Sequence, residues 1–78
     1  MKATVNSDDY RTAHGKPPCG EGVWTFYAIA CRPGCYTQIG PYTVPGVFAT
    51  ARKQAVEMAK AEARGISGVN EVHLEVKE

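Results

Sequence analysis

The sequence lacks a strong excess of charge of either sign, long apolar runs and any catalytic motif. Nine Lys and Arg residues oppose eight Asp and Glu residues, whereas nucleic-acid-binding domains usually carry a basic excess. No segment approaches the roughly 18 apolar residues that a membrane-spanning helix needs. Residues 1–10 lack the apolar core of a signal peptide, so we expect a cytoplasmic protein. The 78 residues have room for one small core, which excludes barrels and doubly wound nucleotide-binding folds.

Charge is missing mainly from the middle of the chain. Residues 22–51 contain a single charged side chain, Arg32, although charged residues are frequent in the C-terminal third. The same segment holds six of the seven aromatic residues, namely Trp24, Phe26, Tyr27, Tyr36, Tyr42 and Phe48. The small net charge therefore conceals a nearly uncharged, aromatic segment that needs a structural explanation.

Three segments have the composition of β-strands. Residues 22–31 (GVWTFYAIAC) are aromatic, β-branched and uncharged, which is typical of a central strand. After a turn centred on Pro33 and Gly34, residues 36–42 (YTQIGPY) return as a second strand. We place this second strand at a sheet edge because it contains proline. Residues 71–77 (EVHLEVK) alternate apolar and polar side chains and predict a third strand.

An alanine-rich helix is predicted between the second and third strands. It begins between Pro45 and Thr50, and Gly65 is expected to end it in a left-handed conformation. Glu62 falls within the apolar arc of this helix, at what we expect to be a frayed end. The other positions of the arc are Phe48, Ala51, Ala55, Met58, Ala59, Ala63 and Ile66.

These elements predict an α+β fold in the order strand, strand, helix, strand. The strands are expected to form a three-stranded antiparallel sheet in the order 3-1-2, with the one helix packed on one face. Residues 22–78 make up this single domain. Residues 1–21 are interpreted as an N-terminal tail, with a possible short edge strand at residues 2–6.

One helix leaves the other face of the sheet uncovered, and a chain this small gains stability when such a face is covered. The sequence therefore predicts a homodimer, formed through this face or through the edge of the second strand. The first-strand side chains expected in the dimer interface are Val23, Thr25, Tyr27 and Ile29. The third-strand side chains expected beside them are Glu71, His73, Glu75 and Lys77.

No catalytic residue, metal site or cofactor is predicted. Zinc-type ligands are present, but their spacing is not typical of structural zinc sites; they are His14, Cys19, Cys31 and Cys35. Cys31 and Cys35 flank the predicted turn, so they are either free thiols, which we favour, or a disulfide. A nucleophile needs an adjacent base, whereas Cys35 and His73 belong to different strands of the predicted sheet.

Nucleic-acid binding is one alternative function. Tyrosines on a sheet face combined with a basic helix resemble a stacking platform beside an electrostatic groove. Glutamates reduce the positive charge of both the sheet face and the helix. The spacing of Lys53, Glu57 and Lys60 is typical of a solvated helix face with ion pairs. The residues of this alternative are Tyr27, Tyr36, Tyr42, Arg52, Lys53, Lys60 and Arg64.

A protein-binding surface agrees better with the uncharged aromatic segment, because interface cores are poor in charge and rich in tyrosine. We expect Tyr36 and Tyr42 on the edge strand, together with Arg32 at the turn, to anchor a partner. An acidic rim lies nearby in the sequence and consists of Asp8, Asp9 and Glu21.

Four segments carry a family resemblance: GVWTFYAIA, QIGPYT, ATARKQAVEMAKAEARG and EVHLEVK. In size and layout they resemble the small phage-encoded anti-CRISPR proteins that inhibit type I surveillance complexes. Several of those proteins combine a short antiparallel sheet with one alanine-rich helix and have no catalytic groups.

The resemblance implies a non-enzymatic inhibitor in the cytoplasm of the host bacterium, which blocks target DNA recognition by protein–protein contact. The carboxylates that it implies in contact with basic residues of the complex are those of Asp8, Asp9, Glu71 or Glu75. This chain is nearly neutral, unlike the more acidic members, which argues against mimicry of DNA. Three functions stay open: an inhibitor, a nucleic-acid-binding module, and a structural or assembly homodimer.

Overall fold

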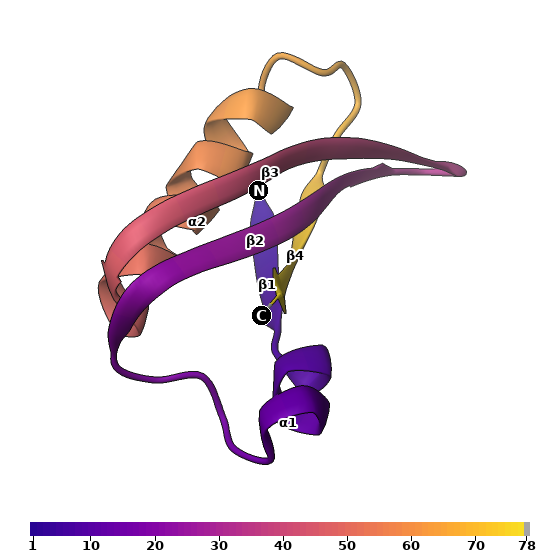
Figure 1. Ribbon diagram of the computed structural model, residues 1–78. Coiled ribbons are helices and arrows are strands. Elements are labelled where there is room, and N and C mark those ends of the chain that lie inside the picture. Colours follow the sequence, from indigo (N-terminus) through magenta and orange to yellow (C-terminus); the bar gives the residue numbers. More distant parts are fainter. Residues whose placement is uncertain (78) are drawn as a thin grey trace.

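The chain folds as an α+β structure in which a sheet carries a long helix across one face (Figure 1). The computed structural model describes residues 1–77; Glu78, the last residue of the predicted domain, lies outside the described residues. The elements, in chain order, are β1 (Lys2–Asn6), α1 (Asp8–His14), β2 (Glu21–Arg32), β3 (Cys35–Val47), α2 (Phe48–Ala63) and β4 (Glu71–Lys77).

The sheet has four strands in the order β1-β4-β2-β3. β2 pairs antiparallel with both β3 and β4, whereas β1 pairs parallel with β4. The predicted α+β class is confirmed, and the order of the three predicted strands, 3-1-2, corresponds to β4-β2-β3. The prediction of a purely antiparallel, three-stranded sheet with one helix is wrong, because the described chain has a mixed four-stranded sheet and two helices.

Both additional elements lie in the segment interpreted as a tail. β1 is the short edge strand considered at residues 2–6, and it pairs with β4 from Lys2 opposite Glu71 to Asn6 opposite Glu75. Only two of its side chains, Ala3 and Val5, pack against the core, so its hydrophobic pattern is short. Backbone pairing with the free edge of β4 therefore contributes stability to β1 that its short hydrophobic pattern alone does not give.

The helix α1 was not predicted because none of its side chains is fully buried. The side chain of Asn6 precedes it and accepts a hydrogen bond from the Asp8 backbone N–H at 2.8 Å. Gly15 ends it with a φ of +71°, and the Gly15 N–H donates to the Arg11 carbonyl at 2.7 Å. The seven-residue helix is therefore fixed by hydrogen bonds at both ends more than by an apolar stripe.

β3 extends beyond its predicted end and contains an irregularity at Gly40 and Pro41. Phe26 of β2 pairs with Tyr42, whereas Ala28 pairs with Ile39, so two residues of β3 stand opposite one of β2. The Gly40–Pro41 peptide bond is cis, and Gly40 has a φ of +74°. This bulge shifts the alternation of β3 by one residue, so that Ile39 and Tyr42 both point into the core.

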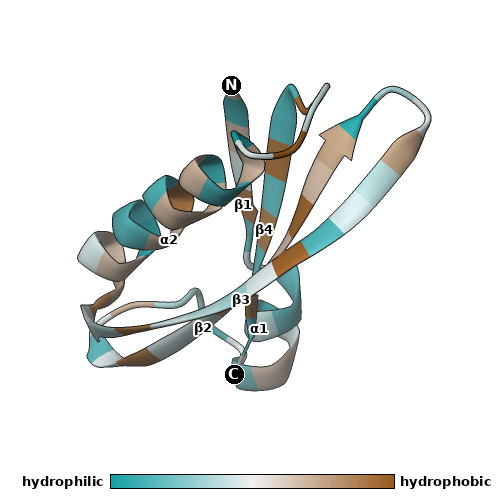
Figure 2. Ribbon diagram, turned by 90° about the horizontal axis from the view of Figure 1, so that it is seen from above, coloured by the Kyte–Doolittle hydropathy of each residue, from teal (hydrophilic) through white to brown (hydrophobic). Residues whose placement is uncertain are grey.

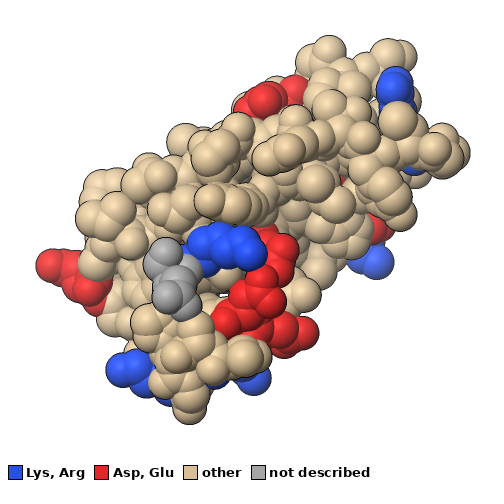
Figure 3. Space-filling view, turned by 45° about the vertical axis from the view of Figure 1, so that its right-hand side comes forward, with Lys and Arg blue, Asp and Glu red and all other residues tan. Residues whose placement is uncertain are grey.

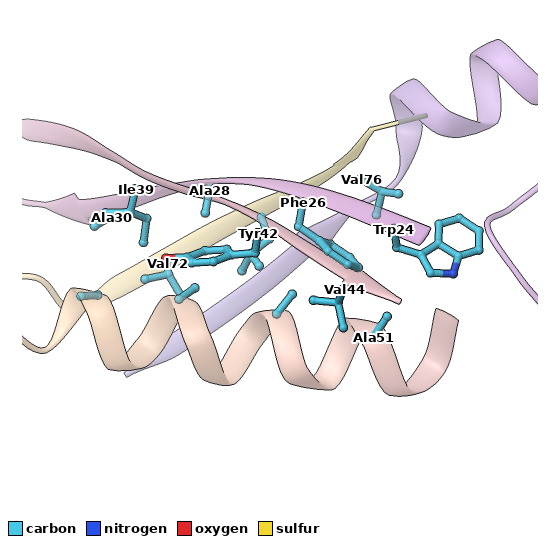
Figure 4. Packing of buried hydrophobic residues seen from close by; sticks show 14 residues of the cluster. Trp24, Phe26, Ala28, Ala30, Ile39, Tyr42, Val44, Ala51, Val72 and Val76 are labelled. Atoms are coloured by element: carbon cyan, nitrogen blue, oxygen red, sulfur yellow. The ribbon is translucent and has the colours of Figure 1, made fainter. Parts of the chain in front are cut away.

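The core lies between α2 and the sheet (Figure 4). α2 contributes one fully buried alanine per turn: Ala51, Ala55, Ala59 and Ala63. Their small side chains let the helix approach large sheet residues such as Trp24 and Phe26. Side chains on β4 alternate between hydrophobic and hydrophilic, as predicted (Figure 2), and the apolar ones are Val72, Leu74 and Val76.

Two details of the helix prediction are wrong. Gly65 does not adopt a positive φ, and the chain leaves α2 through short turns, with the Ile66 N–H donating to the Ala63 carbonyl at 3.0 Å. Gly68, with a φ of +84°, takes the left-handed conformation instead. Met58 is 43% exposed, and Val56 packs against the core in its place.

Candidate partner-binding face

The sheet face opposite α2 is not covered by any element of residues 1–77 (Figure 1). Strand side chains alternate, so every second residue points to this side. We call it the open face and define it by Lys2, Thr4 and Asn6 on β1; Glu71, His73, Glu75 and Lys77 on β4; Val23, Thr25, Tyr27 and Ile29 on β2; and Tyr36 and Gln38 on β3.

The open face exposes apolar surface from its central strand. Val23 is 70% exposed, Tyr27 47% and Ile29 37%, although all three belong to a strand that is paired on both sides. Thr25 is half-buried, and its Oγ lies 3.3 Å from the Oγ of Thr43 on β3. The four side chains predicted for a dimer interface therefore lie together on one uncovered face.

A shallow hollow of about 370 Å³ lies in the middle of the open face. Side chains from all four strands line it, including Tyr27, Ile29 and Gln38, together with His73 and Glu75. The remaining lining residues are Thr4, Asn6, Ala28 and Leu74. Sequence reasoning missed Thr4 and Asn6, because the contribution of β1 depends on parallel pairing that no local pattern indicates. It also missed Gln38, which lies on the predicted second strand opposite Ile29.

α1 brings its two aspartates to one end of this face. The ammonium group of Lys77 donates to Asp9 Oδ2 at 2.9 Å and lies 5.5 Å from the centre of the Tyr27 ring. Figure 3 shows the carboxylates gathered beside a basic side chain on this side of the molecule. Asp9 and Glu75, far apart in the sequence and both predicted to bind a partner, therefore become neighbours.

The charges at this corner influence one another. The hydrogen bond from Lys77, helped by a hydrogen bond with Glu75, lowers the pKa of Asp9. The hydrogen bond with Asp9, followed by partial burial and the charge of Asp9, raises the pKa of Glu75. The pKa of Lys77 is raised chiefly by its hydrogen bond to Asp9. The protonation states of these three side chains are consequently linked.

Glu71 lies at the opposite end of β4, where its carboxylate contacts Nε2 of His73. Cys31 is directly opposite Glu71 on β2 and is buried. Burial, together with the nearby Glu71 carboxylate, raises the pKa of the Cys31 thiol. The two predicted β4 carboxylates therefore lie apart, Glu71 at one end of β4 and Glu75 at the hollow.

The remaining predicted anchors are dispersed. Arg32 lies at the tip of the hairpin and donates to the Ser67 carbonyl at 3.4 Å, and Tyr36 beside it is 75% exposed. Glu21 is exposed at the start of β2, on the border of a second hollow of about 270 Å³. These residues lie at the ends of the hairpin and do not line the central hollow.

Tyr42 is buried, which differs from its expected place on the exposed edge. Alternation from Tyr36 places Tyr42 on the open face, but the bulge at Gly40 and Pro41 turns it into the core. Its hydroxyl donates to Oε1 of Glu62 at 2.6 Å. The Gly-Pro pair within a strand was the sequence signal for this inversion.

Other site types find no support in the described residues. Within residues 1–77, no three His, Cys, Asp or Glu side chains gather in a way that could hold a metal ion. Cys19, Cys31 and Cys35 are free thiols. No helix in the described part of the chain is both long and apolar enough to cross a membrane. In comparisons with known proteins, the chain matches no family model, no curated protein and no solved structure.

Proposed function

We propose that the chain is a non-enzymatic protein that binds a protein partner through the open face. The observation that carries this proposal is the exposure of Val23, Tyr27 and Ile29 on a paired central strand. Such a strand presents its side chains on a rigid backbone, so little conformational entropy is lost when a partner covers them. Tyrosine and aliphatic side chains surrounded by polar residues are the usual composition of an interface centre.

The partner proposed is a type I CRISPR surveillance complex, whose recognition of target DNA the chain blocks by occupying a protein surface. This identification rests on the family resemblance of the four sequence segments. The proposal requires no catalytic step, since the inhibitor acts by remaining bound. The homodimer is proposed as the state of the free protein.

The test is a gel-shift assay in which purified type I complexes bind target DNA with and without the chain. We expect the wild-type chain to abolish the shifted band of at least one complex, and Ile29→Asp to restore it by placing a charge in the apolar centre. Gln54→Asp, on the exposed side of α2, is the matched control and should inhibit like wild type. Circular dichroism establishes that both variants fold. Unchanged DNA binding by every type I complex with wild-type protein would reject the proposed partner.

The nucleic-acid alternative is less well supported. Its tyrosines and its basic residues lie on opposite sides of the sheet, because Tyr27 and Tyr36 belong to the open face and Arg52 and Lys53 are exposed on α2. A stacking platform needs both kinds of side chain along one groove. Salt-sensitive binding of DNA or RNA by the chain alone, at about 150 mM salt, would favour this alternative over ours.

A further inference from the structure

We infer that the hollow of the open face is a binding site for one cationic side chain of the partner, arginine by preference, held between the Tyr27 ring and the Glu75 carboxylate. The inference rests on the proposed function, because it names the chemistry that the partner must present to the open face.

The size of the hollow agrees with a single side chain. Its volume of about 370 Å³ is at the lower end of the range of about 300–1,000 Å³ that small-molecule sites occupy. It is open to solvent along the sheet and formed by strand residues, so a side chain enters it without any element moving. A partner surface that covers the open face would deliver such a side chain from above.

The walls of the hollow match a cation better than an anion. Glu75 supplies a carboxylate, Tyr27 an aromatic ring, and Gln38 an amide oxygen, whereas none of the lining residues among 1–77 is a lysine or arginine. A guanidinium group combines a planar surface that stacks on an aromatic ring with donors that pair with a carboxylate. Arginine therefore uses the ring and the carboxylate together, which lysine does less well.

The chain itself already holds a cation at the border of this site. The Lys77 ammonium lies 5.5 Å from the centre of the Tyr27 ring and donates to Asp9 at 2.9 Å. Lys77 does not line the hollow, and Tyr27 remains 47% exposed, so the ring still has surface for a second cation. An aromatic ring beside carboxylates thus binds an ammonium group here within one chain.

The distribution of charge points to a basic partner rather than to a second copy on this face. The open face with α1 carries four carboxylates, of Asp8, Asp9, Glu71 and Glu75, against three basic side chains, Lys2, Arg11 and Lys77. The reverse holds for α2 and the residue that follows it, where Arg52, Lys53, Lys60 and Arg64 oppose Glu57 and Glu62. A two-fold dimer through the open face would bring two surfaces with an excess of carboxylates together, whereas a basic surface would neutralise them.

The test is an NMR titration of the full, ¹⁵N-labelled chain with the capped peptide Gly-Arg-Gly. Capped Gly-citrulline-Gly, which has the same shape without the charge, is the matched control ligand. We expect saturable shifts of the amides of Tyr27, Ile29 and Glu75 with the arginine peptide and none with the citrulline peptide. Shifts of equal size with both peptides, or shifts confined to α1, would overturn the inference.

Two pairs of variants locate the site. Glu75→Gln and Tyr27→Leu should each lower the affinity for the arginine peptide about three- to tenfold. This is the loss expected for one charged or cation–π contact. Glu71→Gln and Tyr36→Leu change the same residue types on the open face outside the hollow and should bind like wild type. Equal weakening by all four variants would indicate general attraction to an acidic surface and would reject a defined site.

The two proposals fail in different ways. If the wild-type chain inhibits a surveillance complex but does not bind the arginine peptide, the cationic site is wrong and the proposed function stands. If the chain binds the arginine peptide but inhibits no complex, the site is correct and the proposed partner is wrong. Inhibition that is lost in Glu75→Gln and kept in Glu57→Gln, at an exposed position of α2, would support both proposals together.

Discussion

The hydroxyl of Tyr42 on β3 donates a hydrogen bond of 2.6 Å to Oε1 of Glu62, in the last turn of α2. It ties the outer strand of the sheet to the end of the helix. The tyrosine ring is buried, whereas Glu62 is exposed apart from this contact. This relationship explains why an acidic residue falls within the apolar arc of α2: its carboxylate accepts the one polar group that the bulge turns inward.

Replacing Tyr42 by Phe should lower the free energy of unfolding by about 1 kcal/mol, the usual net value of one hydrogen bond. The ring still fills the core, so the loss isolates the hydroxyl. Urea unfolding followed by circular dichroism measures it. Tyr36→Phe, which removes the hydroxyl of an exposed tyrosine, is the control and should leave stability unchanged. Equal stability of Tyr42→Phe and wild type would show that the contact contributes nothing.

The same contact predicts a dependence on alkaline pH. Burial, and then the hydrogen bond and charge of Glu62, raise the pKa of Tyr42 above its usual range. An unfolded tyrosine loses its proton near pH 10, whereas the folded one keeps it, so the folded state binds more protons and stability falls as pH rises above about 10. The stability difference between wild type and Tyr42→Phe should therefore shrink between pH 9 and 11. A difference that stays constant over this range would contradict the pKa shift.

Gly40 is predicted to be required by the bulge. It has a φ of +74°, and a Cβ atom at this position would lie 3.1 Å from a ring carbon of Tyr42. Gly40→Ala should lower stability by about 1–2 kcal/mol, from the left-handed backbone alone. Gly22→Ala is the matched control in the same sheet, because Gly22 has no positive φ and an added Cβ there meets open space. Thermal unfolding of both variants checks the prediction, which fails if they behave alike.

The parts of the fold that follow from local pattern were predictable. β4 alternates without interruption, and the alanine face of α2 recurs at helical spacing. The parts that depend on contacts distant in the sequence were not. β1 exists through parallel pairing with β4, and α1 is held by end hydrogen bonds and by the contact of Asp9 with Lys77.

The candidate site shows the same division. The exposed β2 side chains were predicted, because they follow from alternation on a strand with one covered face. The hollow was not, since Thr4 and Asn6 come from β1 and Gln38 from β3, and no local signal brings these two strands to one face. Tyr42, predicted at the surface, lies in the core because the extra residue of the β3 bulge reverses the alternation of side chains between the two faces of the sheet.

The small residues of α2 set its distance from the sheet, so enlarging one of them should be costly. Ala59 is fully buried, and Ala59→Leu should lower the free energy of unfolding by about 1–3 kcal/mol, as overpacking usually does. Gln54→Leu, at an exposed position of the same helix, is the control and should have little effect. Denaturant unfolding compares the two, and a neutral Ala59→Leu would mean that the core has unfilled space.

Of the two surfaces predicted for the homodimer, the open face and the edge of the second strand, the outer edge of β3 is the more suitable. This strand has 13 residues without a charged side chain, although natural edge strands are usually protected by charge. Prolines 41 and 45 remove N–H donors from the half nearer α2, which leaves residues 36–39 as the segment free to pair. Antiparallel pairing of this segment with its own copy satisfies a two-fold axis and keeps the acidic open faces apart.

Sedimentation velocity at micromolar concentration tests this edge. We expect a dimer for the wild type and a monomer for Tyr36→Lys, because a lysine on an edge strand opposes pairing with a second chain. Gln54→Lys adds the same charge on α2 and should remain dimeric. The dimer should also be insensitive to salt, since the paired segment is uncharged, whereas one built on the acidic open faces would be strengthened as salt screens their mutual repulsion. A wild-type chain that sediments as a monomer contradicts the homodimer, and a dimer that Tyr36→Lys leaves intact places the contact elsewhere.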